Sequence, residues 1–125
     1  MEQCLQVIKA RVFGDQLTAK KIWDELEPMN QKYISKDIVG YNPTEWYGKA
    51  PDLVLPALME KYKQNPYCLK FLLSTENKRI MEASPNDSFW GTGCGLRDPA
   101  LWQGKWNGKN QMGVALEKVR NKLQP

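Results

Sequence analysis

The segment from Met81 to Gly113 reads MEASPNDSFWGTGCGLRDPALWQGKWNGKNQMG, and it holds three of the chain's five tryptophans and six of its nine glycines. Within it, Glu82 and Asp87 flank the turn sequence Ala-Ser-Pro-Asn, just before Phe89 and Trp90. Turn-forming residues gathered with large aromatic side chains indicate either a loop-rich structural corner or one wall of a pocket. The rest of the chain has the patterning of helices, so this segment is the main departure from a plain helical fold.

The composition sets limits on the class of protein. At 125 residues, with 42% hydrophobic and 26% charged residues, the chain is expected to form one globular domain, residues 1–125. It has no apolar run of membrane-spanning length and no signal-peptide pattern, so we expect a cytoplasmic protein with no membrane partner. A net charge of +4 is compatible with ligands that carry phosphate.

The sequence contains no histidine, and its three cysteines have no metal-like spacing. We therefore expect no metal site, and any acid–base chemistry falls to Asp, Glu, Lys, Tyr or Cys.

Apolar residues recur at helical spacing along most of the chain. The pattern predicts helices over residues 2–13, 16–28, 30–41, 51–66, 67–75 and 107–124. Residues 42–51, which include Trp46, read as a turn-rich connector, and RIMEAS at 79–84 is the best strand candidate. The expected fold class is α+β, mostly helical, with one small strand element.

Glu2 and Lys9 are seven residues apart, about two helical turns. Such a pair usually belongs to a solvated helix face. The alternative is an acid and an amine that share a pocket, where each alters the protonation of the other.

Two further features of the opening segment have more than one interpretation. The carboxylates of Glu82 and Asp87 near an aromatic residue are typical of sites that break a glycosidic bond; the alternative is that Asp87 and its neighbours only form a turn. Trp46 and Trp90 are predicted in turn-rich segments, which suggests either stacking on a flat ligand such as a nucleobase or plain packing. GTGCG matches neither the phosphate-loop nor the dinucleotide-binding spacing.

Taken in order, these motifs resemble the NADAR family, also called YbiA-like. The resemblance covers essentially the whole chain and lies in MEQCLQVIKARVFGD, Trp46, LMEKYKQNP, LLST, MEASPNDSFWGTGCG and WNGKNQMGVALEKVR. It implies a single compact YbiA-like domain and an N-glycosidase without a cofactor. The implied substrates are ADP-ribosylated nucleobases, free or in nucleic acid, or ribosylamino-pyrimidine phosphates of riboflavin synthesis.

The resemblance also implies roles for individual residues. Those expected to be catalytic are Glu2, Lys9 and Asp87, and those expected to bind substrate are Trp46, Glu82, Trp90, Gly91 and Asn110. Two routes stay open. In one, the amine of Lys9 forms a Schiff base with the opened sugar; in the other, a carboxylate activates water directly.

Two departures from the family pattern affect these expectations. The family's Glu-His-Tyr reads Glu2-Gln3-Cys4 here, and typical members carry a further segment before this glutamate. A chain shortened in this way is expected to have an open pocket, a wall supplied by a partner chain, or a pocket that binds ADP-ribose or nucleic acid without turnover. A start codon assigned too late would also account for the missing segment.

Overall fold

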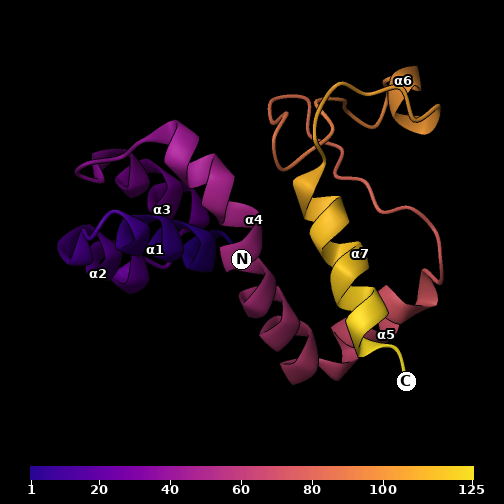
Figure 1. Ribbon diagram of the computed structural model, residues 1–125, viewed down its shortest axis with the longest axis horizontal. Helices are drawn as coiled ribbons and strands as arrows, with labels where there is room; N and C mark the ends of the chain where they lie inside the picture. Colours follow the sequence, from indigo (N-terminus) through magenta and orange to yellow (C-terminus); the bar gives the residue numbers. More distant parts are fainter. The chain divides into compact units, whose positions relative to one another are not determined.

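The computed structural model describes residues 1–125, which fold as two compact units, Met1–Ala57 and Leu58–Pro125. All of its regular structure is helical (Figure 1). In chain order the elements are α1 (Glu2–Val12), α2 (Gln16–Asp24), α3 (Pro28–Ile34), the 3-10 helix η1 (Ser35–Asp37), α4 (Pro43–Gln64), α5 (Pro66–Ser74), α6 (Pro99–Trp102) and α7 (Gln111–Leu123).

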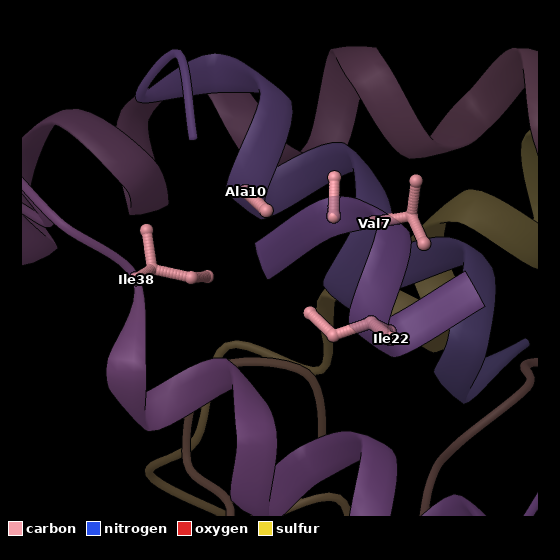
Figure 2. Close-up of a cluster of buried hydrophobic side chains, with 5 residues drawn as sticks. Val7, Ala10, Ile22 and Ile38 are labelled. Atoms are coloured by element: carbon pink, nitrogen blue, oxygen red, sulfur yellow. The ribbon is translucent and has the colours of Figure 1, made fainter. Parts of the chain in front are cut away.

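The first unit is organised around the packing of α1 against α2 and α3. Its core is a cluster of small and branched side chains (Figure 2), with Phe13 and Ile34 partly buried against it; the buried members are Val7, Ala10, Ala19, Ile22 and Ile38. The alanines let the helix backbones approach closely, and the branched residues fill the space between them.

Asp15 starts α2 and ties it to a distant loop. Its carboxylate accepts hydrogen bonds from the backbone N–H of Thr18 at 3.0 Å, the Thr18 hydroxyl at 2.7 Å and the backbone N–H of Val39 at 2.9 Å. These donors, the backbone N–H of Val39 foremost, hold the pKa of Asp15 below its usual value. The side chain is thus both a helix N-cap and a tertiary link.

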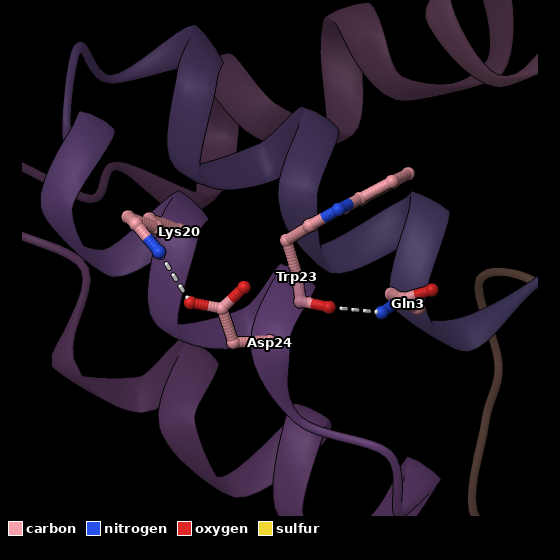
Figure 3. A network of polar contacts seen from close by, with 4 residues as sticks. All are labelled: Gln3, Lys20, Trp23 and Asp24. Atoms are coloured by element: carbon pink, nitrogen blue, oxygen red, sulfur yellow. Dashed lines mark hydrogen bonds and ion pairs between the residues drawn. The ribbon is translucent and has the colours of Figure 1, made fainter.

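Gln3 of α1 forms a hydrogen bond with the C-terminal end of α2. Its Nε2 donates to the backbone carbonyl of Trp23 at 2.6 Å (Figure 3). The exposed ion pair of Lys20 with Asp24, at 2.6 Å, lies on the same helix and contributes little to stability. Gln3 therefore has a structural role in this chain.

Helix α4 contradicts the expected connector at residues 42–51. Asn42 caps the helix, because its Oδ1 accepts from the backbone N–H of Glu45 at 3.1 Å, and Pro43 occupies the first turn. The helix then continues through Pro51 and Pro56.

A buried stripe explains why α4 continues. Trp46, Ala50, Val54 and Leu58 recur every fourth residue and are at most 3% exposed. Burying such a stripe outweighs the roughly 3 kcal/mol by which an interior proline disfavours a helix. Trp46 therefore lies on a helical stripe, and its assignment to a connector was wrong.

Most of the large apolar residues of α2 and of the segment after it face solvent. Ile22 is fully buried, but Leu17 and Trp23 of α2 and Leu26 just after it are 68%, 61% and 87% exposed. The side of α2 that faces α1 consists instead of Thr18, Ala19 and Ile22.

Residues 79–84 form no strand, so the expected α+β class is wrong and the fold is all-helical with long loops. The amide of Asn110 takes the place of a neighbouring strand. Its Nδ2 donates to the carbonyl of Ile80 at 2.8 Å, and its Oδ1 accepts from the N–H of Glu82 at 2.9 Å. The N–H of Ile80 donates to the Glu117 carboxylate at 2.8 Å. With its backbone groups paired to side chains, this segment needs no partner strand.

Helices α5 and α7 pack together in the second unit. Buried Arg120 of α7 reinforces this contact, since its Nη1 donates to the Thr75 hydroxyl at 2.9 Å and to the Lys78 carbonyl at 2.7 Å. Arg120 therefore fixes the chain just after the end of α5.

Candidate functional site

Helix α1 carries a polar cluster of Glu2, Gln6 and Lys9. Gln6 lies four residues after Glu2 and three before Lys9, so the three side chains share one face of the helix. The Nε2 of Gln6 donates to Glu2 Oε1 at 2.6 Å. Gln6 is only 6% exposed, and its own Oε1 is buried without a hydrogen-bond partner.

Lys9 is half-buried, and its Nζ lies 4.4 Å from the centre of the Tyr41 ring. Burial is the main cause that lowers the pKa of Lys9 from its usual value; the charge of Lys32 lowers it further, and the charge of Glu2 acts in the opposite direction. A lysine with a lowered pKa has a larger fraction of neutral amine near pH 7, and the neutral amine is the nucleophilic form.

Tyr41 was not identified from the sequence. Its ring meets Phe13 edge-on at 5.5 Å and covers the amine of Lys9. Burial raises the pKa of Tyr41, and the neighbouring Tyr47 raises it further. Tyr41 follows η1, far from Lys9 along the chain, so no local pattern indicated the contact.

In the second unit, Asp87 forms a turn. Its Oδ1 accepts from the backbone N–H groups of Phe89 at 3.0 Å and Trp90 at 2.9 Å. The turn interpretation of Asp87 is therefore confirmed, while its catalytic role stays a prediction. Both hydrogen bonds are accepted by Oδ1, so they do not involve Oδ2 of the carboxylate.

The loops around Asp87 are joined to one another by backbone bonds. The carbonyl of Glu82 accepts from the N–H and the hydroxyl of Thr92, each at 2.9 Å. Thr92 in turn accepts from Gly108 N–H at 3.0 Å, and Gly91 accepts from Asn110 N–H at 3.0 Å. We call these joined segments, residues 80–92 and 108–113, the loop clamp.

Glycines in the loop clamp are required by close packing. A Cβ at Gly91 would lie 2.8 Å from the Asp87 carbonyl oxygen, and one at Gly113 would lie 2.1 Å from that of Ile80. Asn110 adopts a positive φ of 51°, which asparagine tolerates better than most residues. Gly91 and Asn110 thus have clear structural tasks, and substrate binding by either stays a prediction.

Apart from Trp23 of α2, the tryptophans divide into a buried pair and an accessible pair. Trp46 and Trp90 are 3% and 8% exposed, which favours packing over stacking on a ligand. Trp90 meets Phe89 edge-on at 4.9 Å. Trp102 is exposed and Trp106 is half-buried beneath the Arg79 guanidinium, at 4.7 Å. Binding of substrate by Trp46 or Trp90 stays a prediction.

The predicted site residues belong to both units. Glu2, Lys9 and Trp46 lie in Met1–Ala57, whereas the loop-clamp residues lie in Leu58–Pro125; these are Glu82, Asp87, Trp90, Gly91 and Asn110. Within the first unit the structure adds Gln6 and Tyr41 to the cluster on α1. A spacing of four residues from Glu2 was the signal for Gln6.

A surface depression of about 340 Å³ lies over α1 and α2 in the first unit. It contains none of the predicted site residues and is lined by Arg11, Gln16, Ala19, Lys20, Trp23 and Asp24. None of the helices combines the length and the apolar character needed to cross a bilayer.

Comparison with known proteins places these features in a family context. The NADAR domain model matches residues 1–124. N-glycosidase R617 of Acanthamoeba polyphaga mimivirus is 38% identical over 124 residues, which cover 98% of this chain and 73% of that protein. The riboflavin biosynthesis protein VVA0006 of Vibrio vulnificus is 26% identical over 93% of this chain and 29% of its own length.

The fold has a match among solved structures as well. The NMR structure of the Escherichia coli protein YbiA superposes with a TM-score of 0.76 at 25% identity, and the match covers 98% of this chain and 65% of that protein. The YbiA-like fold expected from the sequence is therefore confirmed, without the strand element. The chain spans less than two thirds of the length of YbiA and of the riboflavin protein.

Proposed function

Because this chain belongs to the NADAR domain family, we propose that it is an N-glycosidase, an enzyme that hydrolyses the bond between the anomeric carbon of a sugar and a nitrogen. Family members named as N-glycosidases support this class of reaction. Within the chain, support comes from the cluster on α1.

The observation that carries the proposal is the environment of Lys9. Its amine is half-buried and has a lowered pKa, and it shares a helix face with the carboxylate of Glu2. A nucleophilic amine with an acid–base group nearby is the equipment for attack on a sugar carbon through a Schiff base. These features favour the lysine route over direct attack by water.

The lysine route requires a substrate whose linking nitrogen carries a hydrogen. The C1–O4 bond of the sugar breaks, the hydrogen of the linking nitrogen moves to O4, and a C1=N bond forms. The neutral amine of Lys9 adds to C1. Its two protons pass to the linking nitrogen through Glu2, and the base leaves as a free amine. Water then hydrolyses the lysine Schiff base to the sugar aldehyde and free Lys9.

We assign the finer roles as part of the same proposal. Oδ2 of Asp87 is the second candidate for proton transfer. Trp46 and Trp90 would hold the ribose or the base, and Glu82, Gly91 and Asn110 would line the substrate site. A partner chain that completes the pocket belongs to this proposal as well.

The proposed substrates carry phosphate. They are nucleobases modified with ADP-ribose, guanine in particular, either free or in nucleic acid, or ribosylamino-pyrimidine phosphates of riboflavin synthesis. The net charge of +4 favours an anionic ligand. A riboflavin biosynthesis protein among the relatives supports the second class.

Release of free base by purified variants tests the function. We expect Glu2→Gln, Lys9→Ala and Asp87→Asn each to lower kcat by about a hundredfold or more, because each removes a proton-transfer or nucleophilic group. Asp87→Asn keeps an oxygen that accepts the turn hydrogen bonds, so it separates the carboxylate from the fold. Lys20→Ala, at an exposed lysine of the same unit, is the matched control.

The outcomes separate the proposed enzyme from a binding module. Full activity in all three variants would contradict the assignment of these residues. Binding of ADP-ribose in calorimetry without turnover on either substrate class would show a binding module instead.

A further inference from the structure

The amine of Lys9 lies over an aromatic face. Its Nζ is 4.4 Å from the centre of the Tyr41 ring, inside the roughly 6 Å over which such a face attracts a cation. The attraction comes from the negative charge density of the ring face, so it acts on the ammonium ion and is lost when the amine gives up its proton. The two protonation states of Lys9 therefore differ in how firmly the side chain is held.

Tyr41 is suited to hold a cation because its ring is packed in place and uncharged. Phe13 meets the ring edge-on at 5.5 Å, which limits its movement. Burial raises the pKa of the Tyr41 phenol above its usual value, so the phenol stays protonated at neutral pH. The ammonium of Lys9 thus meets the face of a neutral ring and not the charge of a phenolate.

Two charged side chains also act on Lys9. Glu2 on α1 favours the ammonium form, Lys32 on α3 opposes it, and partial burial opposes it more strongly than either charge acts. On the far side of the contact, Tyr47 of α4 acts on Tyr41 and raises its pKa further. Of these groups, only the ring of Tyr41 is placed by the structure directly over the amine.

We propose that Tyr41 is a positioning residue: its ring holds the protonated amine of Lys9 in a resting position and releases it on deprotonation. When the ammonium loses its proton to water, the flexible four-carbon stem lets the neutral amine turn toward the anomeric carbon. Release and activation of the nucleophile are then one event. The inference rests on the proposed function for the second of these steps, the attack on the sugar.

Proton NMR of the wild-type chain without ligand tests the resting position directly. The ring face of Tyr41 should shift the ε-methylene protons of Lys9 upfield at pH 7. This shift should be largely lost as the pH rises through the midpoint of the Lys9 titration, because the neutral amine is no longer attracted to the ring. Lys9→Arg assigns the signal.

Two variants separate the aromatic face from plain burial. Tyr41→Phe keeps the ring, whereas Tyr41→Leu keeps only an apolar side chain. We expect Lys9 to titrate in Tyr41→Phe as it does in the wild-type chain, and about half a pH unit to one unit lower in Tyr41→Leu, the effect of one cation–π contact. Tyr33→Leu is the matched control, because the Tyr33 ring lies over Lys36 at 5.4 Å, and it should leave the titration of Lys9 unchanged.

The pH profile of base release separates this role from a structural one. In Tyr41→Leu the midpoint of kcat/KM should move to lower pH by the same amount as the titration of Lys9, and Tyr41→Phe should restore the wild-type midpoint. A ring with a purely structural role would lower the rate at every pH without moving the midpoint.

The inference is overturned if the upfield shift of Lys9 persists above its titration midpoint, or if Lys9 titrates alike in Tyr41→Leu and Tyr41→Phe. If Tyr41→Leu does not fold, the titration of the wild-type chain decides alone. Failure of the proposed function is seen differently, as absence of base release from intact N-glycosides. The NMR titration uses no substrate, so the two failures are distinguishable.

Discussion

Lys9 combines two properties that a surface lysine lacks: partial burial and a ring packed over its amine. Tyr41 covers the amine at 4.4 Å, and burial lowers the pKa of Lys9. Lysine and glutamate at this spacing were visible in the sequence, but the cover was not, because Tyr41 is brought there only by the folding of the chain after η1. The candidate residues could thus be predicted, whereas the burial of Lys9 and its contact with the Tyr41 ring could not.

The lowered pKa of Lys9 predicts the pH dependence of activity. Only the neutral amine attacks the sugar, so kcat/KM should rise with pH and level off below pH 10.5, the usual pKa of lysine. A pH–rate profile measures this. Added ethylamine should restore part of the activity of Lys9→Ala, and a rate that falls as pH rises from 6 to 9 would contradict the role of the neutral amine.

Asp15 predicts how stability depends on pH. Its pKa lies below the usual 3.8 in the folded chain, so its contribution is fully present above pH 3.8 and is lost as the pH falls through the lower folded value. Asp15→Ala should therefore unfold at a clearly lower urea concentration than the wild-type chain at pH 7. This difference should shrink as the pH falls below 3.8. A difference of the same size at pH 7 and at pH 2 would show that the charge plays no part.

At the scale of elements, helical spacing predicted α1, α5 and α7 to within four residues at each end, because each has an apolar stripe and few internal breaks. The start of α4 was predicted at Pro51 instead of Pro43, because a proline is common in the first turn of a helix. The strand at 79–84 was predicted from its composition, but the amide of Asn110 satisfies its backbone, and the partner lies about thirty residues away in the sequence. Contacts of that range leave no local pattern.

Gly113 gives a prediction with an inverted sign. Glycine to alanine within a helix usually stabilises a protein by about 0.5–1 kcal/mol. In α7, however, the added Cβ would lie 2.1 Å from the Ile80 carbonyl oxygen, so Gly113→Ala should lower the free energy of unfolding by about 1–3 kcal/mol.

Gly48 of α4 is the matched control for Gly113. A Cβ there meets nothing within 4 Å, so Gly48→Ala should stabilise the chain by the usual amount. Urea unfolding of both variants measures the contrast. Stabilisation by Gly113→Ala would contradict the close contact between Gly113 and the Ile80 carbonyl.

For the whole molecule, the motifs in the sequence were enough to identify the NADAR family. Relatives in that family are named as N-glycosidases. The structure adds an all-helical architecture in two units and a polar cluster on α1 that fits the lysine route. Asp87, Gly91 and Asn110 also have structural roles in the loop clamp. The sequence indicated such a role only for Asp87, because the contacts of Gly91 and Asn110 arise from packing between segments that are distant in the sequence.

Borohydride trapping tests the central claim, that Lys9 forms a Schiff base with the sugar. The wild-type chain is incubated with ADP-ribosylated guanine nucleoside and sodium borohydride, digested, and mapped by mass spectrometry. We predict one reduced ADP-ribosyl adduct, on Lys9, that is absent from Lys9→Arg and unchanged in Lys20→Ala. Release of free base by the wild-type chain with no adduct, or with an adduct on another lysine, would contradict the account.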